Sequence, residues 1–204
     1  MGDKKVKRFQ ANHTNDPFVA QGDIITNVTY TYEVTINEKY VDVIQLLFPY
    51  VLVLSQSCDL QHGNRLINKE IKSESKVMFS AIVVPFFEKN TICKGEHMSQ
   101  IVKQGLIDCN INNEFIPDEE MGVIKNGLHY RYHLLQFQFD NIAFPDYVID
   151  FKTFFTLNLN ELMKLKQNRL CRLGDIETQQ IVNKFAAFLS RVGISDDKMI
   201  TSKK

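Results

Sequence analysis

The stretch that most constrains the fold is residues 51–54, a run of four apolar residues, half of them β-branched, that follows Pro49. A short run of this kind is typical of a buried strand rather than of a helical turn. The residues after it are polar and reactive: Ser55, Gln56, Ser57, Cys58 and Asp59. Functional groups often lie where a strand leaves a rigid sheet, so we expect a site at residues 55–59.

Strand patterns recur along the chain. They are rich in β-branched and aromatic residues, and turn residues or prolines separate them. The expected strands are residues 24–36, 39–48, 77–84 with an end at Pro85, 130–139 and 147–157. Asn37 and Glu38 supply the turn between the first two, which predicts a hairpin. Residues 61–64 are expected to end the regular structure that follows the strand at residues 51–54. Residues 65–76 are expected to form a short helix or a wide loop.

The clearest helical pattern lies near the end of the chain. Gly174 and Asp175 are typical of a helix start, an apolar stripe follows as far as Val192, and Gly193 is typical of a helix end. A shorter helix is expected at residues 160–170, because Asn158 or Asn160 can cap it.

These elements predict an α+β fold, with a bent, mostly antiparallel β-sheet or an SH3-like barrel and C-terminal helices. The 204 residues, 44% of them hydrophobic, suit one globular domain at residues 18–193. Its barrel-like core is expected at 18–157 and its helical closure at 158–193. Residues 1–17 are predicted to be a flexible arm and residues 194–204 a flexible tail.

Charge and hydropathy limit the kinds of partner that the protein is expected to have. Lysine plus arginine and aspartate plus glutamate both number 24, which disfavours generic nucleic-acid binding and leaves only a local patch open. No apolar run approaches the roughly 20 residues of a membrane span, and the first residues show no apolar signal core. We therefore expect a cytoplasmic protein without a membrane partner, in which the four cysteines are free thiols or metal ligands.

Cysteine and histidine recur at a spacing that suits zinc. Cys58 precedes His62 by four residues, and Cys93 precedes His97 by the same interval. One helical turn or a tight loop lets such a pair bind one tetrahedral ion, and two pairs complete a site. His129 and His133 form an alternate pair. Histidines that bind no metal are the competing interpretation, since some such spacings arise by chance.

Cys58 is also a candidate nucleophile, with Asp59 beside it and histidines elsewhere in the chain as candidate bases. An adjacent carboxylate raises the pKa of a thiol unless it points away, which argues against catalysis. The alternative is a cysteine that only packs in the core.

Two resemblances bear on function. The sequence Gly22-Asp23-Ile24, followed by Val51-Leu52-Val53-Leu54-Ser55, resembles the PemK-like toxin family of small SH3-like barrels that cleave RNA. That family carries a catalytic arginine just before the second of these strands. Here Phe48-Pro49-Tyr50 takes its place, so the resemblance implies the barrel more than the ribonuclease activity.

The chain also resembles uncharacterised bacterial proteins that share three features. These are the Gly-Asp-Ile turn, a strand ending Leu54-Ser55-Gln56-Ser57-Cys58-Asp59, and a C-terminal helix with the sequence of residues 185–193. This resemblance covers most of the chain and implies a bacterial or phage origin.

The expected function is that of a non-enzymatic cytosolic binding or accessory protein with a protein partner. Its site is expected at Ser55, Gln56, Ser57 and Asp59, and the resemblances suggest a toxin–antitoxin or phage-defence context. A diverged PemK-like endoribonuclease and a hydrolase that uses Cys58 are the enzymatic alternatives.

Overall fold

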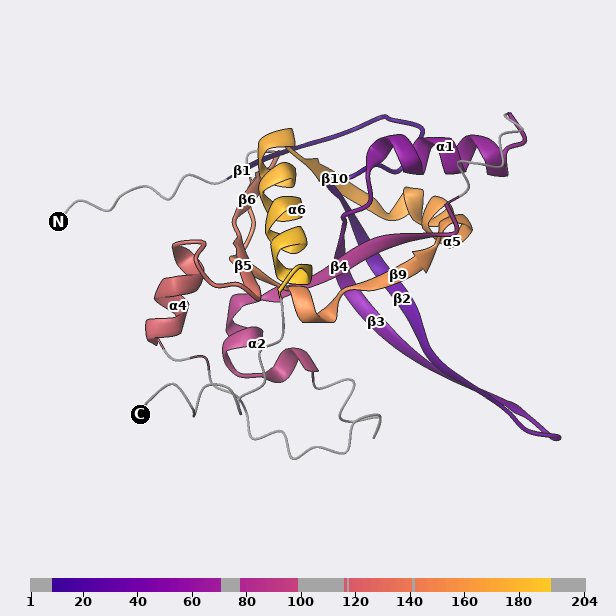
Figure 1. The fold of residues 1–204 in the computed structure, drawn as a ribbon, viewed down its shortest axis with the longest axis horizontal. Helices are drawn as coiled ribbons and strands as arrows, with labels where there is room; N and C mark the ends of the chain where they lie inside the picture. The colour runs from indigo at the N-terminus through magenta and orange to yellow at the C-terminus, as the bar shows by residue number, and fades with distance from the viewer. Residues whose placement is uncertain (1–8, 71–77, 99–115, 117, 141, 192–204) are drawn as a thin grey trace, which may run out of the picture.

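The computed structural model describes residues 9–70, 78–98, 116, 118–140 and 142–191. It has an α+β fold in which helices lie on both sides of one large sheet, and the hairpin of two central strands, β2 and β3, extends beyond the rest of the sheet (Figure 1). The strands are β1 (Phe9–Asn12), β2 (Asp23–Ile36), β3 (Val41–Val53), β4 (Ser80–Glu88), β5 (Tyr132–Leu135), β6 (Phe137–Phe139), β7 (Ile142–Ala143), β8 (Tyr147–Asp150), β9 (Phe155–Asn158) and β10 (Arg169–Leu173).

Helices connect and cover these strands. The α-helices are α1 (Ser57–Ile67), α2 (Lys89–Cys93), α4 (Asp118–Lys125), α5 (Leu159–Lys164) and α6 (Asp175–Leu189). Short 3₁₀ turns are η2 (Glu96–Met98), η3 (Phe151–Thr153) and η4 (Leu165–Asn168). Within these described ranges, no helix has both the length and the apolar character that a membrane span requires.

The sheet has the strand order β5-β8-β4-β3-β2-β10-β1-β6-β7, and β9 pairs with β4 beside β8. Its neighbours are antiparallel except for β1 and β6, which run parallel. The predicted α+β class and mostly antiparallel sheet are therefore confirmed. Because β5 and β7 lie at opposite ends of the strand order, the sheet is open rather than a closed barrel.

Neighbouring residues of the central strands supply two separate cores. Ile24 and Leu52 face α6, where Ile181 and Phe185 pack against them. Their neighbours Ile25 and Val51 face the other side, with Leu60 of α1 and Leu162 of α5. This alternation is the period of two that a sheet buried on both faces requires.

The predicted hairpin at residues 24–48 is confirmed, but its second strand is longer than expected. β3 runs without interruption through Pro49 into the 51–54 run. An extra residue in β2, Tyr32, produces a β-bulge opposite Gln45 and Ile44. A bulge increases the local twist of the strand pair, and the hairpin of β2 and β3 extends beyond the other strands (Figure 1).

Two expected breaks in the chain were wrong. Residues 61–64 do not end the local structure, because they lie inside helix α1. Pro85 does not end its strand either, since β4 continues to Glu88. On one side β4 pairs with β9 through residues 80–83 and with β8 through residues 86–88, so Pro85 lies between these two ladders. A residue without an N–H group is tolerated at such a gap.

Three further boundaries differ from the prediction. The 130–139 strand divides at Gln136, and the 147–157 strand divides at the η3 turn, where the Asp150 side chain accepts a hydrogen bond from the Lys152 N–H group. The helix expected at 160–170 ends at Lys164 and is followed by a 3₁₀ turn, after which residues 169–173 form strand β10 between β2 and β1.

The predicted flexible arm at residues 1–17 also contains ordered structure. Residues 9–12 form β1, which pairs with β10 and β6. The segment after β1 is held by arginines of β10. The Arg169 Nη2 atom donates to the backbone oxygens of Thr14 and Asp16, and the Arg172 Nη1 atom lies 3.1 Å from the Asp16 carboxylate.

Candidate functional site

The polar residues 55–59 lie at the junction between β3 and α1, and two of them hold neighbouring segments. The Ser55 hydroxyl accepts a hydrogen bond of 2.8 Å from the Ile82 N–H group. The Ser57 hydroxyl accepts one of 3.1 Å from the Gln21 N–H group. Gln56, Cys58 and Asp59 are exposed. The two serines therefore join β4 and the turn before β2 to this junction.

Cys58 lies in the first turn of α1 with its thiol toward solvent. Its sulfur lies 3.7 Å from the Gln56 Oε1 atom and 3.6 Å from the Asp59 Oδ1 atom. His62 lies one turn further along the same helix. The proposed roles of Cys58 and Asp59 in catalysis stay predictions.

We expect Cys58→Ser to change the free energy of unfolding by no more than about 0.5 kcal/mol, because the side chain is exposed and its polar contacts are long. Urea unfolding of the two proteins measures this difference. A loss of about 2 kcal/mol or more would contradict a solvent-facing thiol, and would instead agree with a thiol that holds a structural metal ion.

The two predicted zinc pairs lie on different parts of the fold. Cys58 and His62 are on α1, whereas Cys93 ends α2 and His97 lies in η2. Figure 1 shows α1 and α2 on opposite sides of the molecule. Within the described part of the chain, no three or more His, Cys, Asp and Glu residues gather as a metal site would require. Zinc binding therefore stays a prediction, and the described elements do not bring the two pairs together.

The alternate pair, His129 and His133, differs in its surroundings, because His129 has hydrogen-bond partners and both ring nitrogens of His133 are buried without one among the described residues. The His129 Nδ1 atom accepts hydrogen bonds from the N–H groups of Arg131 and Tyr132, and its Nε2 atom lies 3.0 Å from Glu120. Burial lowers the pKa of His129, although Glu120 opposes this effect. Burial, together with the charge of Lys184, lowers the pKa of His133 to about 4. Both imidazoles are therefore held in their neutral forms at pH 7.

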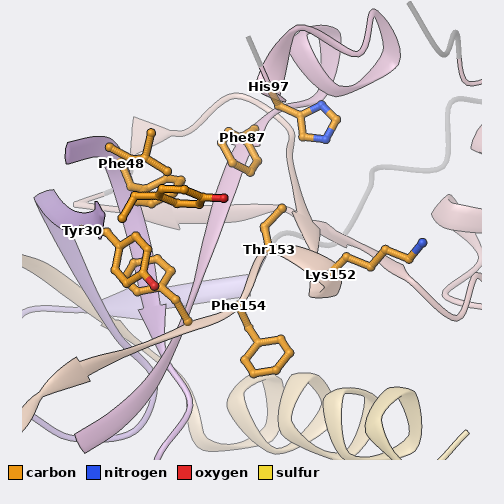
Figure 2. A pocket seen from close by; sticks show the side chains of 10 residues that line it. Tyr30, Phe48, Phe87, His97, Lys152, Thr153 and Phe154 are labelled. Carbon is orange, nitrogen blue, oxygen red and sulfur yellow. The ribbon is translucent and has the colours of Figure 1, made fainter. Parts of the chain in front are cut away.

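The structure assembles another candidate site at the base of the projecting hairpin. A cavity of about 220 Å³ opens between β2, β3, β4, η2, η3 and the start of β9 (Figure 2). Most of its lining residues are aromatic. The lining consists of Tyr30, Tyr32, Leu46, Phe48, Phe87, His97, Lys152, Thr153, Phe154 and Phe155.

The aromatic wall is a connected series of ring contacts. The ring of Phe155 lies 4.7 Å from that of Tyr30 and 5.1 Å from that of Phe48, measured between centroids. Phe48 contacts Phe87 edge to face at 6.4 Å, and Phe87 lies 5.3 Å from the imidazole of His97. Such spacings are favourable for aromatic pairs, so the wall is pre-formed by its own contacts.

His97 brings unsatisfied hydrogen-bonding capacity to this wall. Its side chain is only 6% exposed, and neither ring nitrogen has a hydrogen-bond partner among the described residues. The Nε2 atom faces the Asp150 carboxylate at 3.6 Å, which is longer than a hydrogen bond. Buried polar atoms are normally paired, so a ring nitrogen left unpaired beside a cavity points to a ligand or a water molecule as its partner.

Behind His97 lies a buried ion pair. Asp150 is fully buried and receives two parallel hydrogen bonds from Arg131, at 2.7 Å from Nε and 2.6 Å from Nη2. Burial raises the pKa of Asp150, but the hydrogen bonds and the charge of Arg131 outweigh it and leave this pKa below its usual value. The carboxylate is therefore ionised and fixed in position next to the imidazole.

A second cleft of about 340 Å³ shares the lining residues His97 and Phe87 with the aromatic cavity. Its polar lining includes Glu88 and Glu96, and the aromatic rings of Tyr50 and Tyr147 form part of its wall. Burial and the neighbouring Tyr50 raise the pKa of Tyr147, so its hydroxyl stays protonated. The surroundings of the aromatic cavity on this side are therefore acidic.

The spacing of His97 from Cys93 marked it in the sequence as a candidate site residue, but no pattern in the sequence indicated the cavity. The lining comes from β2 and β3, β4, η2, and the η3 turn with the start of β9, which are distant in sequence. The adjacent Phe154 and Phe155 were the available signal, because consecutive large aromatics cannot both enter one face of a strand. Phe155 is buried, whereas Phe154 is 37% exposed at the cavity.

Comparison with known proteins gives no family assignment. No protein-family model matches the chain, and no curated protein matches it at a significant level.

Proposed function

We propose that the protein is a non-enzymatic binding or accessory protein that accepts an aromatic side chain of a partner protein in the cavity at the base of the hairpin. The observation that carries this proposal is the aromatic wall with the buried, unpaired ring nitrogens of His97 at its edge. Aromatic side chains are preferred anchors in protein interfaces because they fill a pocket and carry a polar atom.

The size of the cavity supports one ring as the ligand. Sites for drug-sized molecules and cofactors have volumes of roughly 300–1,000 Å³, and this cavity measures about 220 Å³. A phenol or an indole suits it better than a whole nucleotide. The phenol O–H or indole N–H group would pair with a nitrogen of His97, so tyrosine and tryptophan are favoured over phenylalanine.

The charges around the cavity support a protein rather than a nucleic acid. Glu88 and Glu96 line the neighbouring cleft, and Glu33 and Asp42 lie further out on the hairpin. Phosphate groups require basic surroundings, and these carboxylates oppose them. Lys152 lines the cavity, but Figure 2 shows its side chain extending away from the labelled rings.

Further parts of the proposal rest on the sequence alone. They are a cytoplasmic location, a bacterial origin, a relation to SH3-like barrels, a role in a toxin–antitoxin or phage-defence system, and zinc binding by Cys58, His62, Cys93 and His97. Binding of an aromatic side chain in the cavity requires none of them.

The proposal predicts selective binding of small aromatic probes. We expect p-cresol and 3-methylindole, the side-chain analogues of tyrosine and tryptophan, to bind with a Kd on the order of 1 mM, as is usual for ligands of this size. Toluene should bind several-fold more weakly, because it leaves His97 unpaired. NMR titration of the backbone amides measures these affinities and locates the site.

Two variants make the test specific. Phe48→Leu keeps an apolar side chain but removes a stacking ring, and should weaken p-cresol binding about 5-fold, which corresponds to roughly 1 kcal/mol. Phe79→Leu is the matched control, since Phe79 is 81% exposed and lies outside the cavity lining. Equal affinity of all three proteins for p-cresol, or tighter binding of adenosine monophosphate than of p-cresol, would overturn the proposal.

A further inference from the structure

The second cleft, which shares His97 and Phe87 with the aromatic cavity, is large enough for a ligand group of its own. Its volume of about 340 Å³ falls within the roughly 300–1,000 Å³ of small-molecule sites. The lining comes from β3, the end of β4, α2, η2 and the start of β8. Because two residues line both spaces, neighbouring groups of one ligand can enter the cavity and the cleft together.

Three aromatic rings form one wall of this cleft. The ring of Tyr50 stacks on that of Phe86 at a centroid distance of 5.5 Å, with 13° between the planes. The ring of Tyr147 meets both edge to face, at 5.5 Å from Tyr50 and 5.2 Å from Phe86. Phe86 and Tyr147 are buried, and Tyr50 is half-buried. Aromatic rings attract cations, so a wall of this kind suits a positively charged group with an apolar stem.

Two carboxylates stand beside the aromatic wall. Glu88 is exposed and is paired directly with Tyr147 in the ladder of β4 and β8, so the two side chains lie on the same face. Burial, Tyr50 and the negative charge of Glu88 together raise the pKa of Tyr147. Glu96, at the start of η2, is exposed as well.

The charge of these two carboxylates is not balanced within the cleft. Among the described residues, neither Glu88 nor Glu96 forms an ion pair. No lysine or arginine belongs to the described lining either. The cleft therefore combines aromatic rings with uncompensated negative charge, which is complementary to a cation.

His97 is an independent indication that a polar group enters this space. Its side chain is only 6% exposed, and both ring nitrogens lack a hydrogen-bond partner among the described residues. A single phenol or indole in the aromatic cavity can pair with only one of them. Because His97 also lines the second cleft, the other nitrogen remains for a group bound there.

We propose that the second cleft binds the guanidinium group of an arginine of the partner protein, next in sequence to the aromatic side chain in the cavity. A guanidinium group is planar, stacks on aromatic rings and pairs with carboxylates, so it can contact Tyr50 together with Glu88 or Glu96. Lysine carries a more strongly hydrated charge and should bind more weakly. The arginine adds to the aromatic anchor, so its binding rests on the proposed function.

Two tripeptides test this pairing of an aromatic ring with a cation. Acetyl-Arg-Tyr-Arg-amide presents an arginine on either side of the ring, whichever way the segment runs, and acetyl-Gln-Tyr-Gln-amide removes both charges. In NMR titrations of the full chain at roughly 0.15 M salt, we expect the arginine peptide to bind about 5- to 10-fold more tightly. It alone should shift the amide signals of Glu88, Thr91 and Glu96. Acetyl-Lys-Tyr-Lys-amide should bind at least about 2-fold more weakly than the arginine peptide.

A pair of double variants locates the effect. Glu88→Gln combined with Glu96→Gln should make the arginine and glutamine peptides bind equally. Both residues are exposed, and Glu88 makes no side-chain capping bond to α2, so unchanged affinity for the glutamine peptide verifies the fold. The matched control is Glu33→Gln combined with Asp42→Asn, which removes the same charge from the hairpin, outside both linings. It should keep the preference for arginine.

Equal binding of the arginine and glutamine peptides to the wild type would overturn the arginine site and leave the aromatic anchor in place. Failure of both peptides to bind would overturn the proposed function and the arginine site together. A preference for arginine that survives in the Glu88 and Glu96 variant, or that the hairpin variant also loses, would indicate general attraction of a cation and overturn the site. A lysine peptide that binds as tightly as the arginine peptide would overturn the assignment to guanidinium.

Discussion

Arg131→Met is expected to lower the free energy of unfolding by about 3–5 kcal/mol at pH 7, because it leaves the fully buried Asp150 carboxylate without its counter-charge. Methionine retains much of the volume of the arginine stem, so most of the loss arises from the uncompensated charge. Urea unfolding at fixed pH measures it. Lys152→Met, which removes an exposed positive charge from a neighbouring segment, should change the stability by no more than about 0.5 kcal/mol.

The same variant should show a characteristic pH dependence. In the wild type the pKa of Asp150 is lowered on folding, so the ionised carboxylate stabilises the fold above its unfolded pKa, and this contribution is lost as the pH falls through the folded value. Without Arg131, burial raises the pKa instead, and protonation at low pH relieves the buried charge. The difference between wild type and variant should therefore shrink between pH 7 and about pH 4. A difference that stays constant with pH would contradict the ion pair as its cause.

Asp23→Ala is the second substitution with a large expected effect. Asp23 is fully buried, accepts a 2.8 Å hydrogen bond from the Ala20 N–H group, and pairs with Arg169 at 3.2 Å and with Arg172. Its removal leaves two guanidinium groups without their shared carboxylate and should cost about 3–5 kcal/mol. Because small domains are stable by only about 5–15 kcal/mol, this loss is a large share of the total and should lower the midpoint of thermal unfolding clearly.

Thermal unfolding followed by circular dichroism measures this loss. Asp16→Ala is the control, since Asp16 also pairs with Arg172 but its side chain is 34% exposed. We expect it to cost about 1 kcal/mol or less. Equal destabilisation by the two substitutions would show that Asp23 does not organise the arginine network.

The parts of the fold that depend on local pattern could be predicted from the sequence. The hairpin of β2 and β3 follows from its β-branched residues and the turn at Asn37, and α6 follows from its apolar stripe between Gly174 and Leu189. The order of the strands and the open ends of the sheet are set by pairings between distant segments. No local pattern contains that information, which is why a barrel and an open sheet could not be distinguished.

Strand β10 and helix α1 were not predicted because each contains residues that are typical of another structure. β10 contains Arg169 and Arg172, which resemble a solvated face until Asp23 is found to pair with both. α1 contains Gly63, which is typical of a turn, yet it lies where a Cβ atom would collide with the Leu159 side chain. Glycine there permits the close approach of α1 to α5, and this need becomes visible only in the packed structure.

The contacts of the predicted site residues also became visible only in the folded structure. The Ser55 and Ser57 hydroxyls each accept a hydrogen bond from a backbone N–H group of a neighbouring segment, and ligand binding by Ser55, Gln56, Ser57 and Asp59 stays a prediction. His97 was grouped with Cys93 by spacing alone, whereas the fold brings it to Asp150 and to the aromatic wall. Residue types at strand exits indicate reactive chemistry, and only the tertiary contacts show which of these groups remain available.

The most direct test of the proposed cavity is a long-range ¹H–¹⁵N NMR spectrum of the His97 ring, assigned with His97→Gln, during titration with p-cresol. The account predicts that a ring nitrogen signal of His97 shifts in step with saturation, and that saturating toluene leaves it nearly unchanged. p-Cresol that binds without moving either nitrogen signal, or that moves both no more than toluene does, would contradict a ligand held by His97 in the aromatic cavity.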